Sequence, residues 1–314
     1  MNKPVIYLRR EGGTWSLSRL IRKQQQEADR QGPARPITID HINITDGTII
    51  VDGREGLIGT SGTSAAPGPS AMPGVELPKR IEHLDAKLAF QYAPVRYTID
   101  IKRVSFRGSD PAIDLNAVSG GISVRDDTVY LQQLALRTAE TSLSVDGAVQ
   151  QYLTTPVVNM QISSDKFSLP EISRLVPALG GIRLELAFDL TLDGPLDRLK
   201  VDTNVRSAAG QITGNVVADM KRPQQSIAGT VSVRNLDLAP ILNDAKQKSD
   251  ITAEAKLNLQ AASFAAPDSI SGTVSLNAAR VVAAGFSAAA LSAHAGQRRQ
   301  SVVLLQLLEA FSLQ

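Results

Sequence analysis

Hydrophobic and polar residues alternate with a period of two along residues 182–192. Apolar side chains occupy every second position, with residues such as Arg183 and Asp189 between them. A period of two over this length predicts a β-strand with one apolar face and one solvated face. An Asp-Gly-Pro turn sequence follows at residues 193–195, and the alternation resumes at residues 199–205. A sheet built from such strands must cover its apolar face, and what covers it decides the function.

The same alternation recurs through most of residues 80–296 and predicts an antiparallel meander. Turn-forming sequences at residues 108–110, 126–127 and 146–147 are expected to separate consecutive strands. The predicted fold class is therefore mainly all-β, built on a long antiparallel sheet with a few short helices.

Two short helices are expected to interrupt the meander, at residues 170–179 and 239–248. Each follows a strand that ends in Leu, and each has a Pro near its start, where the missing N–H costs no hydrogen bond. Three segments that begin at Gly210, Ile227 and Ile270 also resemble one another, because each places a Gly before Val at alternate positions. Their irregular spacing indicates weak repeats rather than a strict solenoid.

The N-terminal part of the chain predicts a helix and a β-hairpin. Residues 14–30 have a plausible N-cap at Thr14 and an apolar stripe followed by polar residues, which indicates a helix. Asp46-Gly47 lies between two β-branched runs and predicts the turn of a hairpin. The apolar positions change phase between Ile39 and Ile42, which suggests a bulge or a kink there.

Four regions follow from these patterns. Residues 1–52 hold the N-terminal helix and hairpin, and residues 53–79 are a Gly, Pro and Ser-rich linker with almost no periodicity. Residues 80–296 form the antiparallel sheet. The Leu-rich residues 297–314 depart from the strand pattern, and we expect an atypical tail that is either an amphipathic helix or sequence foreign to the fold.

Composition and charge exclude several classes of function. The 33 Lys and Arg against 31 Asp and Glu leave a net charge of +2, too small a field to favour a nucleic-acid partner. The chain has no cysteine, which excludes thiol catalysis, disulfides and Cys-ligated metals. It shows no signal-peptide core and no apolar run of about 18 residues that would span a membrane. For a protein of the envelope, we expect the targeting segment to lie outside this chain.

Catalytic and metal-binding patterns are also missing from the sequence. The three histidines, His41, His83 and His294, lie far apart and match no metal-ligand spacing. We expect His41 to be an ordinary exposed residue of a strand. Carboxylates such as Asp189 and Asp193 stand at turns or alternate with apolar residues, as solvated faces and turns demand. We therefore predict no catalytic residue, no metal and no cofactor.

A set of segments combines alternating strands with Asp-Gly turns and phrases such as NLDLAPIL. These segments are residues 12–21, 36–52, 118–149, 167–179, 190–216 and 229–242. Taken together they resemble AsmA and TamB-like envelope proteins, in which a strand, Asp-Gly, strand opening and phrases of this kind are typical. The resemblance covers roughly residues 10–295, and its motifs are patterns of alternation and turns.

The resemblance implies a twisted antiparallel sheet curled into an open groove with an apolar concave face. It implies a non-enzymatic protein of the cell envelope and periplasm that serves phospholipid transport or homeostasis between the inner and outer membranes. It also implies association with the inner membrane through a segment absent from this chain. The partners expected are phospholipid acyl chains and, in a TamB-like role, the outer-membrane assembly machinery.

The alternating apolar residues are the candidates for the groove lining. Burial of acyl chains on them would contribute about 0.8 kcal/mol per CH₂ group, without directional contacts. The predicted lining residues are Ile182, Leu184, Leu186, Phe188, Leu190, Leu192, Leu143, Val145, Val231, Val233, Leu257 and Leu259.

Two alternatives to lipid transport stay open at this point. In the first, the same residues form the dry core of a closed, structural or adhesin-like β-sandwich that binds no lipid. In the second, the sheet edges pair with client strands, and the protein assists the assembly of outer-membrane proteins.

Overall fold

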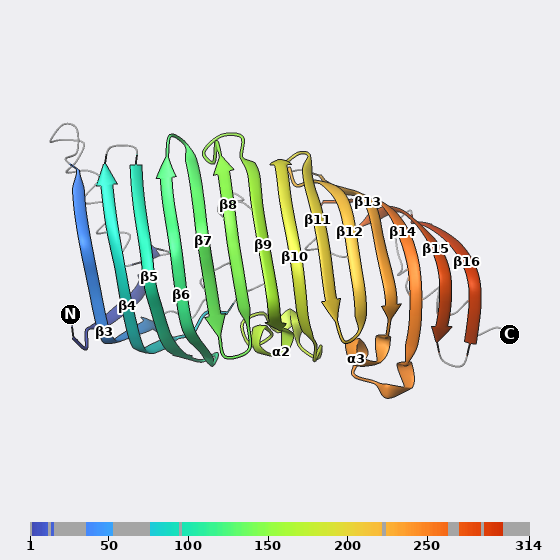
Figure 1. The fold of residues 1–314 in the computed structure, drawn as a ribbon, viewed down its shortest axis with the longest axis horizontal. Helices are drawn as coiled ribbons and strands as arrows, with labels where there is room; N and C mark the ends of the chain where they lie inside the picture. Colours follow the sequence, from blue (N-terminus) through green and yellow to red (C-terminus); the bar gives the residue numbers. More distant parts are fainter. Residues whose placement is uncertain are drawn as a thin grey trace. The chain divides into compact units, whose positions relative to one another are not determined.

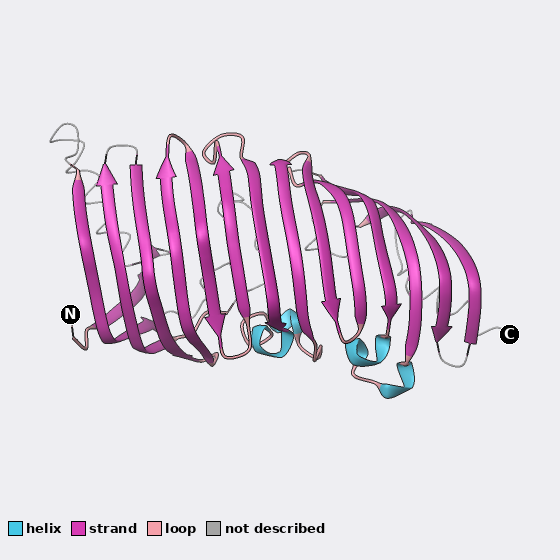
Figure 2. Cartoon of the chain, in the orientation of Figure 1, coloured by secondary structure: helices cyan, strands magenta, loops and turns pink. Residues whose placement is uncertain are grey.

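The computed structural model describes most of the chain as two compact units. The described residues are 2–11, 14–15, 36–52, 76–93, 96–221, 224–262, 270–283 and 286–297. The first unit comprises Met1–Tyr152 and Pro170–Gly180, and the second comprises Leu153–Leu169 and Gly181–Gln314. Strands dominate both units, and helices are few and short (Figure 2).

The sheet of the first unit is a meander with one parallel addition. From β3 to β8, each strand pairs antiparallel with the next strand along the chain, while β1 pairs parallel to β3 and antiparallel to β2 (Figure 1). Its strands are β1 (Val5–Glu11), β2 (Thr14–Trp15), β3 (Ile37–Asp52), β4 (Arg80–Ala93), β5 (Arg96–Ser109), β6 (Ile113–Arg125), β7 (Thr128–Thr138) and β8 (Ser142–Gln150).

The sheet of the second unit is antiparallel throughout, and each strand pairs with its neighbours in the chain. Its strands are β9 (Val157–Ser168), β10 (Glu185–Pro195), β11 (Leu199–Ser207), β12 (Gly210–Asp219), β13 (Gln225–Leu236), β14 (Ser249–Ala261), β15 (Ser271–Ala283) and β16 (Phe286–Gln297). In neither unit do the described strands close into a barrel. The predicted fold class, a mainly antiparallel all-β open sheet, is confirmed.

The two predicted helical inserts are present at strand ends. After β9 come α2 (Leu169–Ile172) and the 3₁₀ turn η1 (Pro177–Leu179). After β13 come α3 (Leu238–Leu242) and η2 (Ala245–Gln247). Asp237 caps α3, because its carboxylate accepts hydrogen bonds from the backbone N–H of Ala239 at 3.1 Å and of Ser249 at 2.9 Å. These two bonds lower the pKa of the Asp237 carboxyl.

A buried carboxylate ties the α2 segment to the first unit. Glu171 is only 2% exposed, and its carboxylate accepts a hydrogen bond from the hydroxyl of Thr138 at 2.5 Å. That hydroxyl in turn accepts the backbone N–H of Thr141 at 2.9 Å, so the end of β7, the turn after it and the helix meet at one point. The alternation of apolar residues gave no signal for this contact.

The predicted hairpin at Asp46-Gly47 is wrong, because β3 runs unbroken through both residues. Asp46 adopts a left-handed φ of 52°, and the pairing of β3 with β4 shifts on either side of Gly47. Asp and Gly suit a left-handed conformation equally well in a turn and in a bulge, and here they form a bulge. The bulge predicted between Ile39 and Ile42 is confirmed.

The expected turn at residues 146–147 is also wrong, since β8 continues through Asp146 and Gly147. The Asp146 carboxylate accepts the backbone N–H of Gln133 at 2.9 Å, and Gln133 has a left-handed φ of 48°. The register between β7 and β8 shifts next to this residue. The Asp-Gly pair therefore accommodates a bulge in the neighbouring strand. The turn predicted at residues 126–127 is confirmed, and the one predicted at 108–110 begins only at residue 110, because β5 continues to Ser109. The turn predicted at residues 193–195 is wrong in position, because β10 continues to Pro195 and the turn occupies residues 196–198.

The N-terminal helix predicted from Thr14 is wrong at its start, because Thr14 and Trp15 pair with Glu11 and Arg10 as β2. The rest of that segment, residues 16–30, lies outside the described residues. So do residues 53–75 of the predicted linker and residues 298–314 of the predicted tail.

Two of the three weak repeats, those that begin at Ile227 and Ile270, have a backbone explanation in their glycines. Gly229 and Gly272 have φ values of 153° and 135°, which side chains rarely adopt. A Cβ at Gly229 would lie 2.3 Å from the carbonyl oxygen of Asn215, and one at Gly272 would lie 2.1 Å from that of Asn258. Each glycine lets a neighbouring strand approach closely, so the repeated Gly marks a ladder position that excludes a side chain.

We predict that Gly229→Ala destabilises the second unit by about 1–3 kcal/mol, because the new Cβ would meet backbone in a strained conformation. Thermal unfolding followed by circular dichroism measures the change. Gly214→Ala is the matched control on the neighbouring strand: its Cβ would meet the Thr203 methyl group at 3.0 Å and no backbone atom closer than 4.0 Å. Equal melting temperatures for the two variants would contradict this explanation of the repeats.

Candidate apolar binding face

The ladder register places most of the predicted lining residues on one face of the second unit. On β10, the side chains of Leu186, Phe188, Leu190 and Leu192 are half-buried, and the residues at 189, 191 and 193 are exposed. The observed strand therefore has the apolar face and the solvated face that the alternation predicted.

Hydrogen-bonded pairing extends three of these positions, Phe188, Leu190 and Leu192, sideways into continuous rows. Residues directly opposite each other in a ladder lie on the same face, so each row can be followed from strand to strand. The row through Leu192 is Met160, Leu192, Val201, Val216, Gly229, Leu257 and Val274. The row through Leu190 is Ile162, Leu190, Thr203, Gly214, Val231, Ala255 and Leu276.

Two flanking rows have the same character. The row through Phe188 is Ser164, Phe188, Val205, Ile212, Val233, Ala253 and Ala278. The row on the other side is Leu199, Ala218, Ile227, Leu259 and Gly272, and Val158 pairs with Gly194 at the corresponding level of β9 and β10. These four rows, from β9 to β15, contain no charged residue, and we name them the apolar face of the second unit.

No second layer of described residues packs against the apolar face of the second unit. Among the described residues of this unit, extensive contacts join only strands that neighbour each other in the sheet, or α3 with η2. The predicted residues Val231, Val233, Leu257 and Leu259 are accordingly half-buried rather than buried. The closed sandwich predicts a second layer on this face, and the described residues provide none.

Two predicted lining residues lie elsewhere. Ile182 and Leu184 precede β10, which begins at Glu185, so they belong to the connection after η1. Leu184 is 7% exposed, and its carbonyl oxygen accepts the backbone N–H of Leu169 at 3.0 Å. The alternation continues past the end of the strand because Leu184 is buried for a different reason, at the junction with α2.

The first unit has an apolar face of its own, and Leu143 and Val145 lie on it. They pair with Leu136 and Leu134 of β7. Two of the rows that make up this face are Ile44, Ala86, Val104, Val118, Leu136 and Leu143, and Ile39, Phe90, Ile99, Ile122, Leu131 and Gly147. We name it the apolar face of the first unit. The sequence analysis missed most of it, because bulges in β5 and β7 shift the phase of the alternation.

The opposite face of the second unit is polar and internally paired. Asp189 forms an ion pair with Arg206 at 3.5 Å, and Asp193 accepts a hydrogen bond from the side-chain amide of Asn159 at 3.3 Å. The amide of Asn204 accepts a hydrogen bond from Gln211 at 2.9 Å. This face is therefore polar, and the uncharged rows lie on the opposite one.

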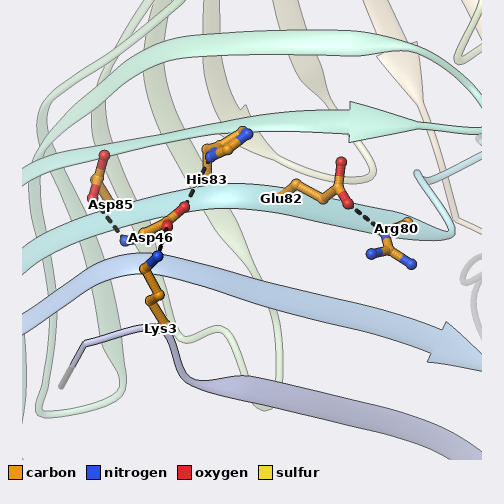
Figure 3. Close-up of polar contacts among 6 residues, drawn as sticks. All are labelled: Lys3, Asp46, Arg80, Glu82, His83 and Asp85. Atoms are coloured by element: carbon orange, nitrogen blue, oxygen red, sulfur yellow. Dashed lines mark hydrogen bonds and ion pairs between the residues drawn. The ribbon is translucent and has the colours of Figure 1, made fainter.

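A cluster of polar side chains lies on the first unit, outside its apolar face (Figure 3). The Asp46 carboxylate lies 2.8 Å from Nδ1 of His83 and 3.6 Å from Nζ of Lys3. The backbone N–H of Asp46 donates to the Asp85 carboxylate at 3.1 Å. The hydrogen bond from His83 is the main cause that lowers the pKa of the Asp46 carboxyl. These contacts join the N-terminal segment to the bulges of β3 and β4, a structural task.

An open hollow of about 400 Å³ lies beside this cluster and is a weaker candidate for a lipid site. Its lining includes His83, Arg103, Arg107 and Asn116. Arg107 pairs with Asp114 at 3.4 Å, and Arg103 donates to the carbonyl oxygen of Asn116 at 3.4 Å. Burial of acyl chains there would desolvate these charges, which is costly.

The described residues of both units offer little support for a metal site or a membrane-spanning helix. Among the described residues, no group of three or more His, Asp or Glu side chains is placed to hold a metal ion. His41 is exposed on β3, as expected. Asp197 pairs with Lys221, and this contact lowers the pKa of the Asp197 carboxyl. Within the described segments, no helix has the length and apolar character needed to cross a membrane.

Comparison with known protein families found no family model that matches the chain, and comparison with curated proteins and with solved structures found no match either.

We predict that Asp46 stabilises the first unit above its usual titration range and loses this effect in acid. Because folding lowers the pKa of Asp46 below its ordinary value of 3.8, the contribution is complete above that value. It disappears as the pH falls through the folded-state pKa. Thermal unfolding of Asp46→Asn and wild type should therefore differ at neutral pH and converge in strong acid.

Asp40→Asn is the control for this measurement, since Asp40 is an exposed carboxylate on the same strand. It should melt like wild type at every pH. A gap between Asp46→Asn and wild type that persists unchanged in strong acid would contradict the role given to the ionised carboxylate.

Proposed function

We propose that this chain is a non-enzymatic, AsmA-like protein of the cell envelope that holds phospholipid acyl chains on the apolar faces of its sheets. In this role it serves phospholipid transport or homeostasis between the inner and outer membranes. The observation that carries the proposal is the set of four uncharged ladder rows on the second unit, with no second layer over them among the described residues.

The dimensions and chemistry of the rows suit acyl chains. Neighbouring strands lie about 4.8 Å apart, so the row from Met160 to Val274 extends about 29 Å across the sheet. Acyl chains of one leaflet occupy half of a hydrocarbon core about 30 Å thick, so a single chain is shorter than the row. The side chains offer non-directional contacts, which stabilise each CH₂ group by about 0.8 kcal/mol and favour no single position. A lipid can therefore move along the row without passing a specific site.

The polar residues support a role without catalysis. The carboxylates of Asp189, Asp193 and Asp197 lie in exposed positions and have hydrogen-bond or ion-pair partners. A general acid needs a carboxyl whose pKa is raised toward neutrality, whereas the pKa of Asp197 is lowered.

Assembly of outer-membrane proteins is the second candidate function, and one observation favours it. Among the described residues, β16 pairs with β15 on one side only. A strand edge of this kind can add a strand of another protein through backbone hydrogen bonds. The two functions differ in what they bind, because one captures lipid on a face and the other captures peptide at an edge.

Leu186→Asp combined with Leu190→Asp tests the lipid proposal. Leu190 lies within an apolar row and Leu186 lies on the same face of β10, so each new carboxylate would carry a large desolvation cost on contact with acyl chains. We expect wild-type protein purified from a membrane-containing host to retain phospholipid, as detected by native mass spectrometry and lipid extraction, and the double variant to lose most of it.

Thr191→Asp is the matched control, because Thr191 directly follows Leu190 and lies on the exposed face of β10. It should retain lipid like wild type. A lipid-free, heat-stable wild-type protein would overturn the lipid proposal. If the wild type instead co-purifies with peptide strands, the assembly function becomes the better one.

A second test uses the absence of cysteine, which makes every introduced thiol unique. We predict that a solvatochromic label on Val231→Cys shifts its emission to the blue when phospholipid is added, because Val231 stands in the row of Leu190. The same label on Thr230→Cys should not respond, since Thr230 pairs with Asn215 and Lys256 on the polar face. Equal responses at the two positions would contradict face-specific binding.

A further inference from the structure

Tyrosines gather at one end of the first unit's sheet. The chain has five tyrosines, and four of them lie at the end where β4 meets β5 and β6 meets β7. Tyr92 and Tyr97 flank the β4–β5 connection, Tyr130 lies at the start of β7, and Tyr152 follows β8. The backbone N–H of Tyr152 donates to the carbonyl oxygen of Asp127 at 3.3 Å, which holds Tyr152 against the β6–β7 turn.

Two of these tyrosines end the apolar face of the first unit. The rings of Tyr92 and Tyr97 stack with their centroids 5.8 Å apart. The ladder places them in one row with Ile37, Val124 and Val129. Two members of this row are open to solvent, since Ile37 is 52% exposed and Tyr97 is 40% exposed.

Arginines accompany the tyrosines at the same end. Arg96 and Arg125 pair directly across β5 and β6, and the guanidinium of Arg125 lies 4.8 Å from the centre of the Tyr130 ring. Arg96 lies 4.0 Å from the carboxylate of Asp126, so its charge is partly offset. We name this group of Tyr92, Tyr97, Tyr130, Tyr152, Arg96 and Arg125 the tyrosine lip.

We propose that the tyrosine lip docks on the surface of a phospholipid bilayer, at the level of the headgroups. Tyr has an apolar ring and a polar tip and is enriched where hydrocarbon meets water. Arg places its apolar stem along hydrocarbon while the guanidinium reaches the phosphate level. Exposed Ile37 and Tyr97 supply the apolar contact, and the stacked pair connects it to the apolar face behind.

The charges at the lip determine whether it favours a zwitterionic or an anionic lipid surface. Asp126 and Asp127 stand in the β6–β7 turn beside the two arginines, so the end of the sheet carries no excess positive charge. Docking therefore depends on interfacial burial of the rings rather than on attraction to anionic lipid. Zwitterionic phosphatidylcholine vesicles are the appropriate probe.

The tyrosine lip deepens the proposed function and rests on it in one respect: an acyl chain that leaves a bilayer at this end meets the apolar face of the first unit directly. The fifth tyrosine, Tyr7, lies away from the lip. Tyr7 is 57% exposed, but it pairs with Ile50, which in turn pairs with Arg80 at the opposite end of β4. Exposure of a tyrosine is therefore not confined to the lip, and Tyr7 offers a control.

Flotation of the full chain with phosphatidylcholine vesicles tests the proposal. We expect wild type to float with the vesicles, and Tyr92→Ser combined with Tyr97→Ser to float several-fold less. Tyr7→Ser should float like wild type. Raising the salt from about 0.1 M to about 1 M shortens the Debye length from about 10 Å to about 3 Å, and wild-type binding should persist.

A second variant distinguishes loss of membrane binding from loss of folding. Arg96→Glu combined with Arg125→Glu leaves the stacked rings in place and brings carboxylates to the phosphate level, so we expect flotation to fall several-fold with an unchanged circular dichroism spectrum. Flotation equal to wild type in both the tyrosine and the arginine variants would overturn the proposal. So would wild-type binding that is abolished by salt, or absent.

The proposal for the tyrosine lip and the proposal for the apolar faces can be overturned independently of each other. The Leu186→Asp, Leu190→Asp variant should lose co-purified lipid and still float, since its changes lie in the second unit. The lip variants should still retain lipid supplied in detergent. Lipid-loaded protein that does not float overturns the lip alone, and lipid-free protein that floats overturns the proposed function alone.

Discussion

Register is the constraint on which the rest of this structure depends. A slip of one residue between two strands would move every apolar side chain of one strand to the solvated face. The backbone hydrogen bonds keep Leu192, Val201 and Val216 in one row, and the glycine at position 229 continues it where a side chain would collide with Asn215. The apolar face is thus a property of the pairing, and no single residue creates it.

Much of the fold could be predicted from the sequence, because period-two alternation is a local signal. It identified β10, β11 and the short helices after Leu169 and Leu238. It was wrong at Asp46-Gly47, since a turn and a bulge call for the same left-handed backbone and only the partner strand decides between them. Alternation also continued through Leu184, which is buried by contact with the α2 junction rather than by strand geometry.

The candidate faces were predictable only in part. Within the four rows of the second unit the alternation keeps one phase, because the register shifts of that unit lie outside them, so Leu190 and Val231 could be assigned to one face without knowledge of the pairing. In the first unit, bulges reverse the phase within single strands, and the rows emerge only from the register. The tyrosine lip was beyond sequence reasoning, because residues 92, 97, 130 and 152 meet only when the hairpins align their ends.

The order of the strands has a consequence for how such a sheet arises. From β3 to β8, and again from β9 to β16, each strand pairs with the strand that precedes it in the chain. Pairing between strands that are close in the sequence has low contact order. Each new hairpin can therefore pair with strands that have already folded while the rest of the chain is being synthesised. Duplication or loss of one hairpin in a gene would lengthen or shorten the sheet without disturbing the strands on either side. A protein of this design can change its reach in evolution by whole hairpins. Among the described strands, β1 differs because its parallel partner β3 is not the next strand, so this pairing must wait until β3 has been made.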